Sequence, residues 1–485
     1  MNYGLLSLEI GVVALGLGLL LLDLWTPAAQ KPRLGYAAAT GLAFILLFSF
    51  TNFTGQSTGT AFHDMFIQDA MSLFFKRLFL VTAIIVLLMS VDFSNRLPTG
   101  VTEYYALQLF ALAGMMTAAS ANNFTLLFVS VELITVTFYI LVSFQRNRLV
   151  SLEAGTKYLI LGALSSAFLI FGIALIFGMT GHLDFQGVAS FVRQSPAEPL
   201  LQAGILLVIV GLGFKIAALP VQLWAPDVYQ GAPTPTTAFL AVGSKAAGFV
   251  LLLRVLHFAI PDIAEAWYRL LIGLSAFTIL YGNLCAIPQT NLKRLLGYSS
   301  IAHAGYLLLG IATLSTPGQE AVLFYLGTYL FTVLAALGVI TIAFQGLDSE
   351  EITSLAGLHQ KSPFLAAALA LAMVSLAGIP PLAGFFGKFL LFKAALEAGQ
   401  TDPLYYTLVG VAIFGVVVSL YFYLGVVRTL YWPKNPATSA APTPSISLPL
   451  KWALSICMIA IILLGIAPRL LLQACQLVAS ASVGL

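Results

Sequence analysis

The sequence predicts an all-α polytopic membrane protein with about 14 transmembrane helices, and two observations lead to this fold class. Of the 485 residues, 60% are hydrophobic and only 8% are charged, whereas soluble domains have about 45–50% apolar and about 25% charged residues. The apolar residues also fall into runs of about 20, the length at which a helix crosses a ~30 Å hydrocarbon core. A chain of this kind is expected to be one membrane domain, residues 1–485.

These apolar runs give the expected helices in chain order. The first, from Leu5 to Leu22, lacks a basic start and a small-residue cleavage site, so it is a retained span rather than a removed signal. The loops between the runs are short, which leaves no extramembrane domain for a nucleotide, a flavin or an iron–sulfur cluster. The expected spans are 4–23, 35–51, 75–92, 103–120, 122–143, 155–178, 201–224, 236–258, 267–287, 294–313, 320–345, 363–396, 404–431 and 450–471.

Composition also excludes several kinds of site and partner. The net charge of +3 is too small to indicate a nucleic-acid partner. The three cysteines and five histidines are scattered, without the spacing of a disulfide framework or a metal centre. No glycine-rich phosphate loop or nucleophile elbow is present. The sequence therefore predicts no cofactor and no metal in this chain.

The basic residues predict the orientation. With the N-terminus outside, most basic residues would fall in inner loops, whereas the outer loops and helix ends would carry chiefly Arg193, Arg254, Arg269 and Arg469. The positive-inside rule then places both termini on the outer, periplasmic face. Lys76 and Arg77 contradict this rule, because they lie near the outer end of the third span. The expected inner residues are Lys31, Arg33, Arg96, Arg146, Arg148, Lys293, Arg294, Lys361, Arg428, Lys434 and Lys451.

One stretch carries the strongest indication of function. Lys215 lies more than halfway along the span that starts at Leu201, so its ammonium is expected near the middle of the bilayer. Pro220 follows, and it removes an amide donor and kinks or breaks the helix. A charge at this depth costs about 2.5–3.5 kcal/mol on the insertion scale. A cation beside a broken helix is therefore a functional candidate.

Three further ionisable residues are expected at similar depth. They are Glu132, Lys245 and Lys388, each in a different span. A row of such groups linked by water is what a proton relay requires, and burial can lower the pKa of a lysine from about 10.4 toward neutrality. Glu132 is the natural partner of Lys215, and movement of this carboxylate would change the proton affinity of the ammonium. The alternative is structural: Glu132 could simply hold two helices together.

Other ionisable residues are open to two interpretations. His303 is flanked by Ser299, Ser300 and Tyr306, where an imidazole can shuttle protons or be a hydrogen-bonded core residue. Lys157 lies near the start of its span and can extend to the interface. No transport role is expected for a set of residues that look interfacial or lie near helix ends: Glu9, Asp69, Lys76, Arg77 and Asp227.

A faint internal repeat links the sixth and eleventh spans. Glu153-Ala154 and Tyr158-Leu159 are spaced like Glu320-Ala321 and Tyr325-Leu326, and the same register pairs Phe177 with Phe344. An offset of five spans is odd, so the two copies would cross the membrane in opposite senses. Inverted repeats with broken helices near the midplane are typical of transporters. Chance similarity between apolar helices is the alternative.

Several motifs resemble the antiporter-like membrane subunits of respiratory complex I. They are Trp224-Ala-Pro-Asp-Val-Tyr-Gln-Gly-Ala-Pro-Thr-Pro235 with Ser244-Lys245, and Asn291-Leu-Lys-Arg-Leu-Leu-Gly-Tyr-Ser-Ser-Ile-Ala-His303. A third, from Ala377-Gly-Ile-Pro-Pro to Phe-Gly-Lys388, is similar to the branch called subunit N, or subunit 2 in mitochondria. The resemblance covers about positions 100–430. The sequence has no long amphipathic extension after Pro468, unlike the related L branch.

The resemblance implies a fourteen-helix fold with two inverted five-helix repeats that contain broken helices. The repeats would be residues 103–258 and 267–431, preceded by N-terminal helices in 1–100 and followed by a C-terminal span, 450–471. It also implies proton pumping in an inner membrane, coupled to partner subunits of the membrane arm. NADH, flavin, iron–sulfur clusters and quinone would bind in partner subunits. The family's relay positions match Glu132, Lys157, Lys215, Lys245 and Lys388.

The resulting hypothesis is a relay in which protons pass from the inside to Lys215, Lys245 and His303 and leave through Lys388. Glu132 and Lys157 would couple the charge state to neighbouring subunits. One departure matters: relatives often have His where this chain has Gln222, and an amide cannot titrate. Two other functions are compatible with the sequence, a subunit of a multi-subunit cation/proton antiporter and a structural membrane-arm subunit.

Overall fold

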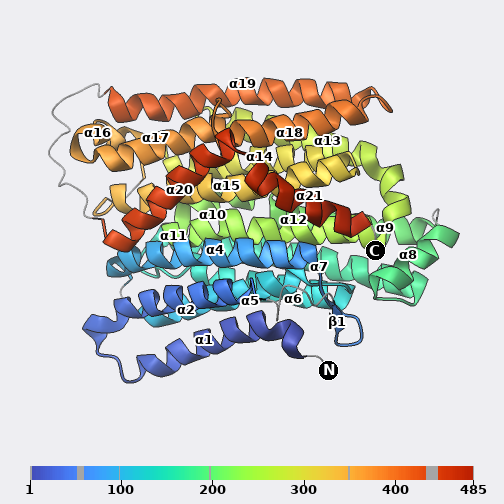
Figure 1. The fold of residues 1–485 in the computed structure, drawn as a ribbon, viewed down its shortest axis with the longest axis horizontal. Helices are drawn as coiled ribbons and strands as arrows, with labels where there is room; N and C mark the ends of the chain where they lie inside the picture. Colours follow the sequence, from blue (N-terminus) through green and yellow to red (C-terminus); the bar gives the residue numbers. More distant parts are fainter. Residues whose placement is uncertain are drawn as a thin grey trace.

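The helices of the computed structural model lie side by side, mostly along one common direction, and both termini lie at the same end of the bundle (Figure 1). The structure describes residues 3–51, 59–97, 99–195, 198–347, 350–432 and 446–483. Among them, eleven helices are long and apolar enough to cross a membrane. Termini at the same end agree with the fourteen crossings that the sequence predicts, because that number is even. Which face of the membrane the termini occupy remains a prediction.

The N-terminal region contributes three long helices and a small hairpin. Asp69 caps the third of these helices, because its carboxylate accepts from the backbone N–H of Ser72 at 2.7 Å. The elements are α1 (Ser7–Asp23), α2 (Leu34–Phe48), β1 (Gly59–Ala61), β2 (Phe66–Gln68) and α4 (Ala70–Phe93), with β1 and β2 antiparallel.

The two following groups of helices form most of the bundle. The first is α5 (Val101–Ala119), α6 (Phe124–Val142), α7 (Leu149–Thr180), α8 (Phe185–Gln194), α9 (Pro199–Ile216), α10 (Trp224–Gly231), α11 (Thr234–Phe239) and α12 (Lys245–Arg254), with a π-helical turn, Leu240–Ser244, between the last two. The second is α13 (Pro261–Ala286), α14 (Leu292–Ala312), α15 (Thr316–Ala343), α16 (Leu358–Lys361), α17 (Pro363–Ala377), α18 (Ala383–Ala398) and α19 (Leu404–Tyr431). Two helices close the chain, α20 (Leu448–Ile466) and α21 (Arg469–Val483).

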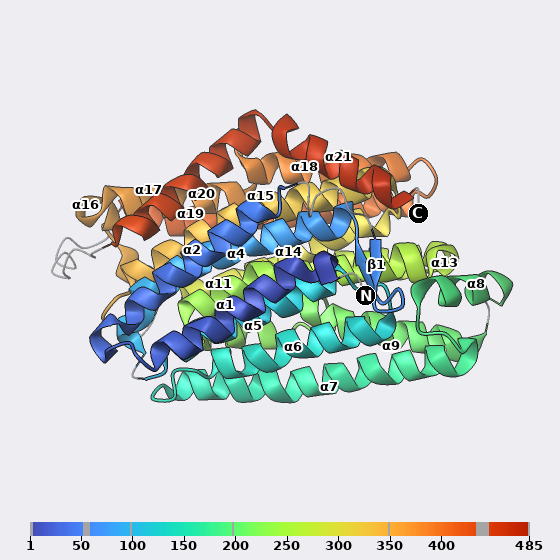
Figure 2. The ribbon, with the colours of Figure 1, turned by 60° about the horizontal axis from the view of Figure 1, so that its bottom comes forward.

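All fourteen predicted spans fall on helices, but some details differ. The expected span 201–224 ends at Ile216, and the span 363–396 is divided into α17 and α18. The amphipathic α8 and the β hairpin lie in segments where the sequence predicted only loops. The chain also continues after Pro468 as the fifteen-residue α21, which Figure 2 shows meeting α20 at a sharp bend.

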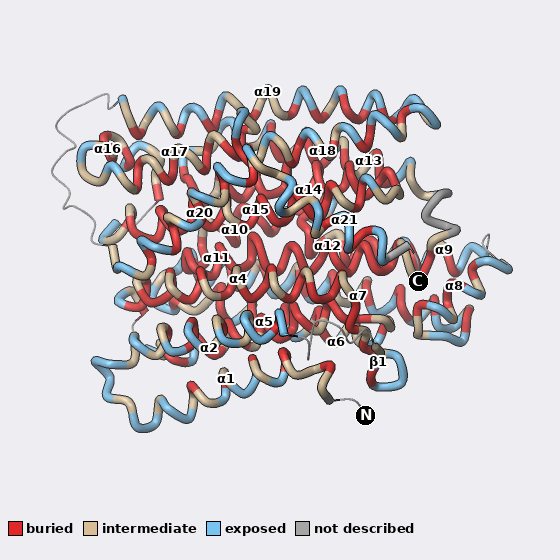
Figure 3. Tube along the Cα trace, in the orientation of Figure 1, coloured by how far each residue is buried: buried red, intermediate tan, exposed pale blue. Residues whose placement is uncertain are grey.

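Burial is strongest at the centre of the bundle (Figure 3). All residues of the most apolar 18-residue segment are buried in the helical stretch Thr234–Ala259, and 94% of them are buried in Leu292–Ala312. The corresponding values are only 33% for Leu149–Thr180 and 28% for Leu448–Ile466. The helices that carry Lys245 and His303 are therefore inside the protein, whereas α7 and α20 form its periphery.

The two large groups share local features at matching places. Asn123 caps α6 and pairs with Asp184 in an isolated β-bridge, while Asn291 caps α14 and pairs with Glu351. Both broken helices end in a left-handed residue, Ala217 (φ 59°) after α9 and Gly378 (φ 84°) after α17. A left-handed residue is a common helix stop. These features support the inverted repeats 103–258 and 267–431, which remain a prediction.

Candidate functional site

The first group of polar side chains lies where α9 ends. Lys215 is in the last turn of α9, and its Nζ donates to the hydroxyl of Thr135 on α6. Glu132, one turn before Thr135, accepts a hydrogen bond from Ser166 of α7. No ion pair within 4.0 Å joins Glu132 to Lys215, although the two charges are close enough to interact. Thr135 therefore holds the ammonium, and the carboxylate stands nearby.

Lys245 forms the second group together with a serine on α14. Its Nζ donates to the backbone oxygen of Ser300 at 2.5 Å and also to the hydroxyl of that serine. The same hydroxyl lies 2.9 Å from the hydroxyl of Tyr229 and 3.1 Å from that of Tyr329. Ser300 is thus a junction between α10, α12, α14 and α15.

Close packing brings this group next to the first one. A Cβ added to Gly248 of α12 would lie 3.1 Å from the Cβ of Lys215. Gly248 is three residues after Lys245, on the same side of α12. The absence of a side chain at this glycine lets the end of α9 approach α12.

His303 is the centre of the third group. Its Nδ1 lies 2.5 Å from the hydroxyl of Tyr325 and its Nε2 lies 3.1 Å from the hydroxyl of Tyr423. The Tyr423 hydroxyl is also hydrogen-bonded to Ser299, one turn earlier on α14. Both ring nitrogens therefore have a hydroxyl partner, which is the arrangement that lets an imidazole take a proton on one side and release it on the other.

Lys388 completes the set on α18. Its Nζ donates to the carbonyl oxygens of Leu376 and Ala377 at 2.8 and 3.3 Å, at the end of α17. The last carbonyls of a helix have no partner within the helix and carry partial negative charge, so they attract an ammonium. The same Nζ lies 5.1 Å from the ring centre of Tyr306.

These groups form a polar line through the interior. Ser300, His303 and Tyr306 follow one another at intervals of three residues, so they share one face of α14 between Lys245 and Lys388. Lys215, Lys245, His303 and Lys388 are 6%, 2%, 2% and 3% exposed. Their predicted burial is confirmed. Hydroxyls and imidazoles both donate and accept, and an ammonium that has lost its proton also accepts, so the line has the chemistry of proton transfer.

Lys157 lies apart from this line. Its side chain is 43% exposed and forms ion pairs of 2.7 Å with both Glu153 and Asp227. Asp227 also pairs with Arg294 of α14 at 2.5 Å. Asp227, which the sequence placed near a helix end without a role, therefore joins α7, α10 and α14. The role of Lys157 remains a prediction.

Glu132 also differs from the lysines in burial. It is only partly buried, and its neighbours Val129, Leu133 and Val136 on α6 are exposed. Figure 2 shows α6 and α7 along one edge of the bundle. Glu132 is thus placed between Lys215 and an exposed apolar face.

Gln222 lies in the segment between α9 and α10. It is buried, and its Oε1 has no hydrogen-bond partner within the described part of the chain. The nearby Trp224 ties α10 to α9, because its Nε1 donates to the backbone oxygen of Phe214 at 3.0 Å. The position is consistent with an amide that orients water but does not titrate.

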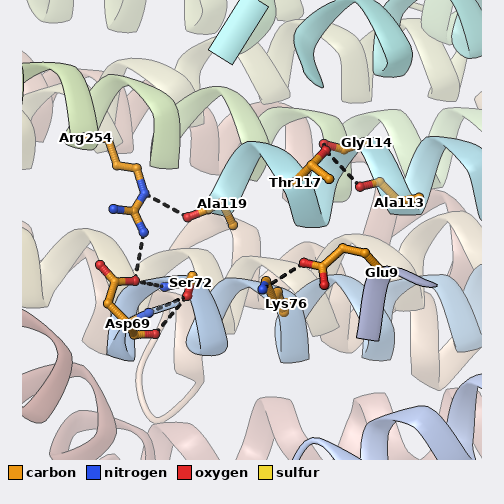
Figure 4. A network of polar contacts seen from close by, with 9 residues as sticks. All are labelled: Glu9, Asp69, Ser72, Lys76, Ala113, Gly114, Thr117, Ala119 and Arg254. Carbon is orange, nitrogen blue, oxygen red and sulfur yellow. Dashed lines mark hydrogen bonds and ion pairs between the residues drawn. The ribbon is translucent and has the colours of Figure 1, made fainter. Parts of the chain in front are cut away.

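A second cluster of charges is buried outside the line (Figure 4). Lys76 of α4 pairs with Glu9 of α1 at 2.8 Å, and both side chains are almost fully buried. Arg254 pairs with Asp69 at 2.8 Å and donates to the backbone oxygen of Ala119. Glu9 lies in the first turn of α1, near a helix end as predicted. Lys76 and Asp69, which look interfacial in the sequence, are buried. Their partners lie far away in the sequence, so no local pattern could reveal the pairs.

One more buried lysine escaped the sequence analysis, which counted it only as an inner-loop charge. Lys293, near the start of α14, donates to the backbone oxygen of Ala232 at 2.6 Å. It also lies 3.7 Å from Glu350, and both side chains are buried. Among the described residues, no group of three or more histidine, cysteine, aspartate or glutamate side chains could hold a metal ion.

Comparison with known proteins relates this architecture to a family. The model of the NADH:quinone oxidoreductase/Mrp antiporter transmembrane family matches residues 121–418. The chain is 42% identical over 473 residues to NADH-quinone oxidoreductase subunit N of Heliobacterium modesticaldum, covering 96% of this chain and 97% of the relative.

Solved structures agree. A chain of respiratory complex I from Thermus thermophilus with bound aureothin matches with a TM-score of 0.80 and 33% identity, covering 96% of this chain and 99% of the other. A chain of the Mrp complex from Dietzia sp. DQ12-45-1b has a TM-score of 0.82 over 99% of this chain and 97% of the other, but at 21% identity it shows only a common fold. The chain therefore belongs to the NADH:quinone oxidoreductase/Mrp antiporter family of membrane subunits, in the branch of the NADH-quinone oxidoreductase N subunits.

Proposed function

We propose that this chain is a proton-translocating membrane subunit of an NADH-quinone oxidoreductase in a bacterial inner membrane. The observation that carries the proposal is the buried line of Lys215, Lys245, His303 and Lys388. The first three are hydrogen-bonded to hydroxyl groups, and the last lies 5.1 Å from the ring centre of Tyr306. Four ionisable groups in hydrocarbon are costly, at about 2.5–3.5 kcal/mol for each charge on the insertion scale. A function that uses their titration explains why the chain carries them.

In this proposal a proton moves between neighbouring groups along the line. An uncharged Lys215 accepts a proton from the inner side, and Lys245 receives the next one through water, where α9 and α12 approach closely at Gly248. The Tyr329 hydroxyl is bonded to Ser300, the partner of Lys245. Its ring centre lies 5.2 Å from that of His303, whose two nitrogens face other hydroxyls. Lys388 releases the proton toward the outer side. Approach of Glu132 favours the charged form of Lys215, and its withdrawal favours proton release.

Electron transfer belongs to other subunits in this proposal. NADH, flavin, iron–sulfur clusters and quinone would bind in partner subunits. Glu132 and Lys157 lie at the α6 and α7 edge, where a neighbouring membrane-arm subunit would contact the chain. A change in that neighbour would then move Glu132 relative to Lys215 and shift the proton between the two.

Replacing Lys215 with Ala in the assembled enzyme tests the proposal. Protons pumped per electron should fall sharply, because the first group of the line is lost, and Lys393→Ala is the matched control. Lys393 is 61% exposed and lies outside the line. The measurement is proton uptake by inside-out membrane vesicles during NADH oxidation. An unchanged ratio of protons to electrons for Lys215→Ala would refute the assignment.

The cation/proton antiporter remains the second candidate function, because the matched family model includes Mrp antiporters. The two functions differ in their partners. Purification of the chain in mild detergent should retain quinone-site and iron–sulfur subunits in the first case and small antiporter subunits in the second.

A further inference from the structure

An apolar groove lies outside the polar line, between α2, α4, α15 and the two C-terminal helices. Its volume is about 630 Å³. Leu73, Leu78 and Leu330 line it and are buried, whereas Phe50 and Leu477 line it and are 62% and 71% exposed. The groove thus has a buried apolar floor and a rim that opens to the surroundings of the protein, which for this bundle are the lipid bilayer.

Arg77 is the one charged residue among the described side chains that line the groove. Its Nη2 donates to the backbone oxygen of Ser49 at 2.6 Å, and its Nε lies 3.3 Å from the Ser49 hydroxyl. The guanidinium also lies 4.1 Å from the ring centre of Phe50. All three partners are neutral, and no ion pair within 4.0 Å involves Arg77 in the part of the chain that the structure describes.

Lys76, the residue before Arg77, lies in a different environment. Lys76 points to the inside of the protein and is neutralised by Glu9. Arg77 has no such carboxylate and faces the groove. Ser49 and Phe50 directly follow the last residue of α2, so the guanidinium is level with a helix end, where the headgroups of a bilayer begin. It also lies at the end of the bundle where the sequence predicts few cations.

We propose that the groove binds an anionic phospholipid, with its phosphate at Arg77 and an acyl chain along the apolar floor. The charge of Arg77 selects an anionic group, and the buried leucines select a hydrocarbon chain. A guanidinium matches the oxygens of a phosphate in a bidentate geometry. The groove lies on the face away from α6 and α7, so binding does not compete with the contact assigned to Glu132.

The test uses the assembled enzyme in nanodiscs of phosphatidylcholine with increasing amounts of phosphatidylglycerol. Native mass spectrometry counts the phosphatidylglycerol molecules that remain bound. Arg77→Gln should weaken this binding about fivefold, the effect of one basic residue at an anionic membrane surface. Ala474→Phe fills the groove from α21 and should displace the lipid while the guanidinium is intact.

Two controls leave the groove unchanged. Arg269→Gln removes an exposed cation elsewhere, and Val417→Phe adds a ring to an exposed position of α19. Both should bind the lipid like the unaltered enzyme. The proposal would be overturned if Arg77→Gln and Ala474→Phe each retained as much phosphatidylglycerol as the unaltered enzyme. It would also be overturned if the unaltered enzyme retained phosphatidylcholine to the same extent as phosphatidylglycerol. Loss of a neighbouring subunit with an unchanged lipid count would overturn it too, since the groove would then hold a protein helix. Proton pumping that depends on Lys215 is independent of each outcome.

Discussion

The lysines of the two broken helices have different kinds of partner. At the first break, Lys215 precedes the interruption and its ammonium turns to another helix, where it meets Thr135 and faces Glu132. At the second, Lys388 follows the interruption and its ammonium turns back to the carbonyls that end α17. One lysine has a titratable neighbour on a peripheral helix, and the other has fixed backbone dipoles within its own broken span.

This difference assigns separate tasks to the two breaks. A carboxylate can gain a proton or move away, so the environment of Lys215 can change during turnover. The partial charge at a helix end is about −0.5 and cannot titrate. Lys388 therefore depends on the geometry of its break, whereas Lys215 depends on the charge of a neighbour. Variants that alter geometry or charge alone distinguish the two.

The largest effect is expected from a change in the geometry of the second break. A Cβ at Gly465 of α20 would lie 2.1 Å from the backbone oxygen of Pro381 and 2.7 Å from the Cα of Leu382. Backbone atoms cannot retreat as a side chain can, so Gly465→Val must displace α20 or the break. Misplacement of about 1 Å can cost up to a hundredfold in rate. Protons pumped per electron should fall about tenfold or more.

The control for this variant is Gly425→Val on α19, where nothing lies within 4 Å of an added Cβ. Subunit content of the purified enzyme shows whether each variant assembles, and Gly465→Ala is a milder change if the valine variant does not. Normal proton pumping by the assembled Gly465→Val enzyme would mean that α20 does not hold the second break in place.

A smaller effect is expected from removing the charge at the first break. Glu132→Gln keeps an oxygen for Ser166 but loses the carboxylate that faces Lys215. Two charges 4 Å apart interact by about 4 kcal/mol at an effective dielectric constant of 20. Since Glu132 is farther away, loss of about tenfold in proton pumping is expected, or about 1.4 kcal/mol.

Ser166→Ala is the matched variant, because it removes the hydrogen bond and retains the charge. Its pumping should fall less than that of Glu132→Gln, because the carboxylate that interacts with Lys215 is retained. If Glu132→Gln pumps normally in inside-out vesicles, the contrast between a switched and a fixed lysine is wrong.

The smallest effect concerns the turn after α18, which helps to hold the second broken helix at its far end. Tyr268 of α13 donates a hydrogen bond to Asp402, and this bond holds the pKa of Asp402 below its ordinary value, with a further bond from the backbone N–H of Leu404. A carboxyl with a lowered pKa stabilises the fold above its unfolded pKa of about 3.9, and this contribution disappears as the pH falls.

Tyr268→Phe should therefore lower the thermal stability slightly at neutral pH. The difference from the unaltered protein should shrink as the pH falls below about 4 and disappear below the lowered pKa of Asp402. Tyr421→Phe on α19 serves as control, since Tyr421 is 72% exposed. Melting temperatures of the purified enzyme at several pH values provide the measurement. A difference that persists in acid would show that the hydroxyl stabilises the protein through another contact, such as the 3.0 Å hydrogen bond that it accepts from Arg269.

The sequence was informative where one residue decides the outcome. A lysine deep in an apolar run is expected to be buried in protein, and a proline after it is expected to interrupt the helix, so Lys215, Lys388 and the break after Lys215 were predictable. The break before Lys388 divides 363–396, which the apolar pattern alone predicted as one span. Lys245 followed from the same argument on depth, whereas His303 was singled out by its flanking hydroxyls and left open to two interpretations. The family's motifs then added Lys157, which lies at the surface in two ion pairs and whose role remains a prediction.

Contacts between distant segments could not be predicted in this way. Ser300 became a junction because α10, α12 and α15 all pack against α14, and no local pattern encodes this. Tyr325 and Tyr423 reach His303 from two other helices. The burial of Lys76 depends on Glu9, which lies two helices earlier, so the lysine alone looked interfacial.

Asp227 forms ion pairs with both of the predicted repeats. A single carboxylate on α10 binds a lysine from the first half and an arginine from the second. Any displacement of α10 large enough to change the first break must stretch or release one of these two bonds. Because Asp227 bridges the two predicted repeats, we expect a motion of α10 to change its contacts with both Lys157 and Arg294.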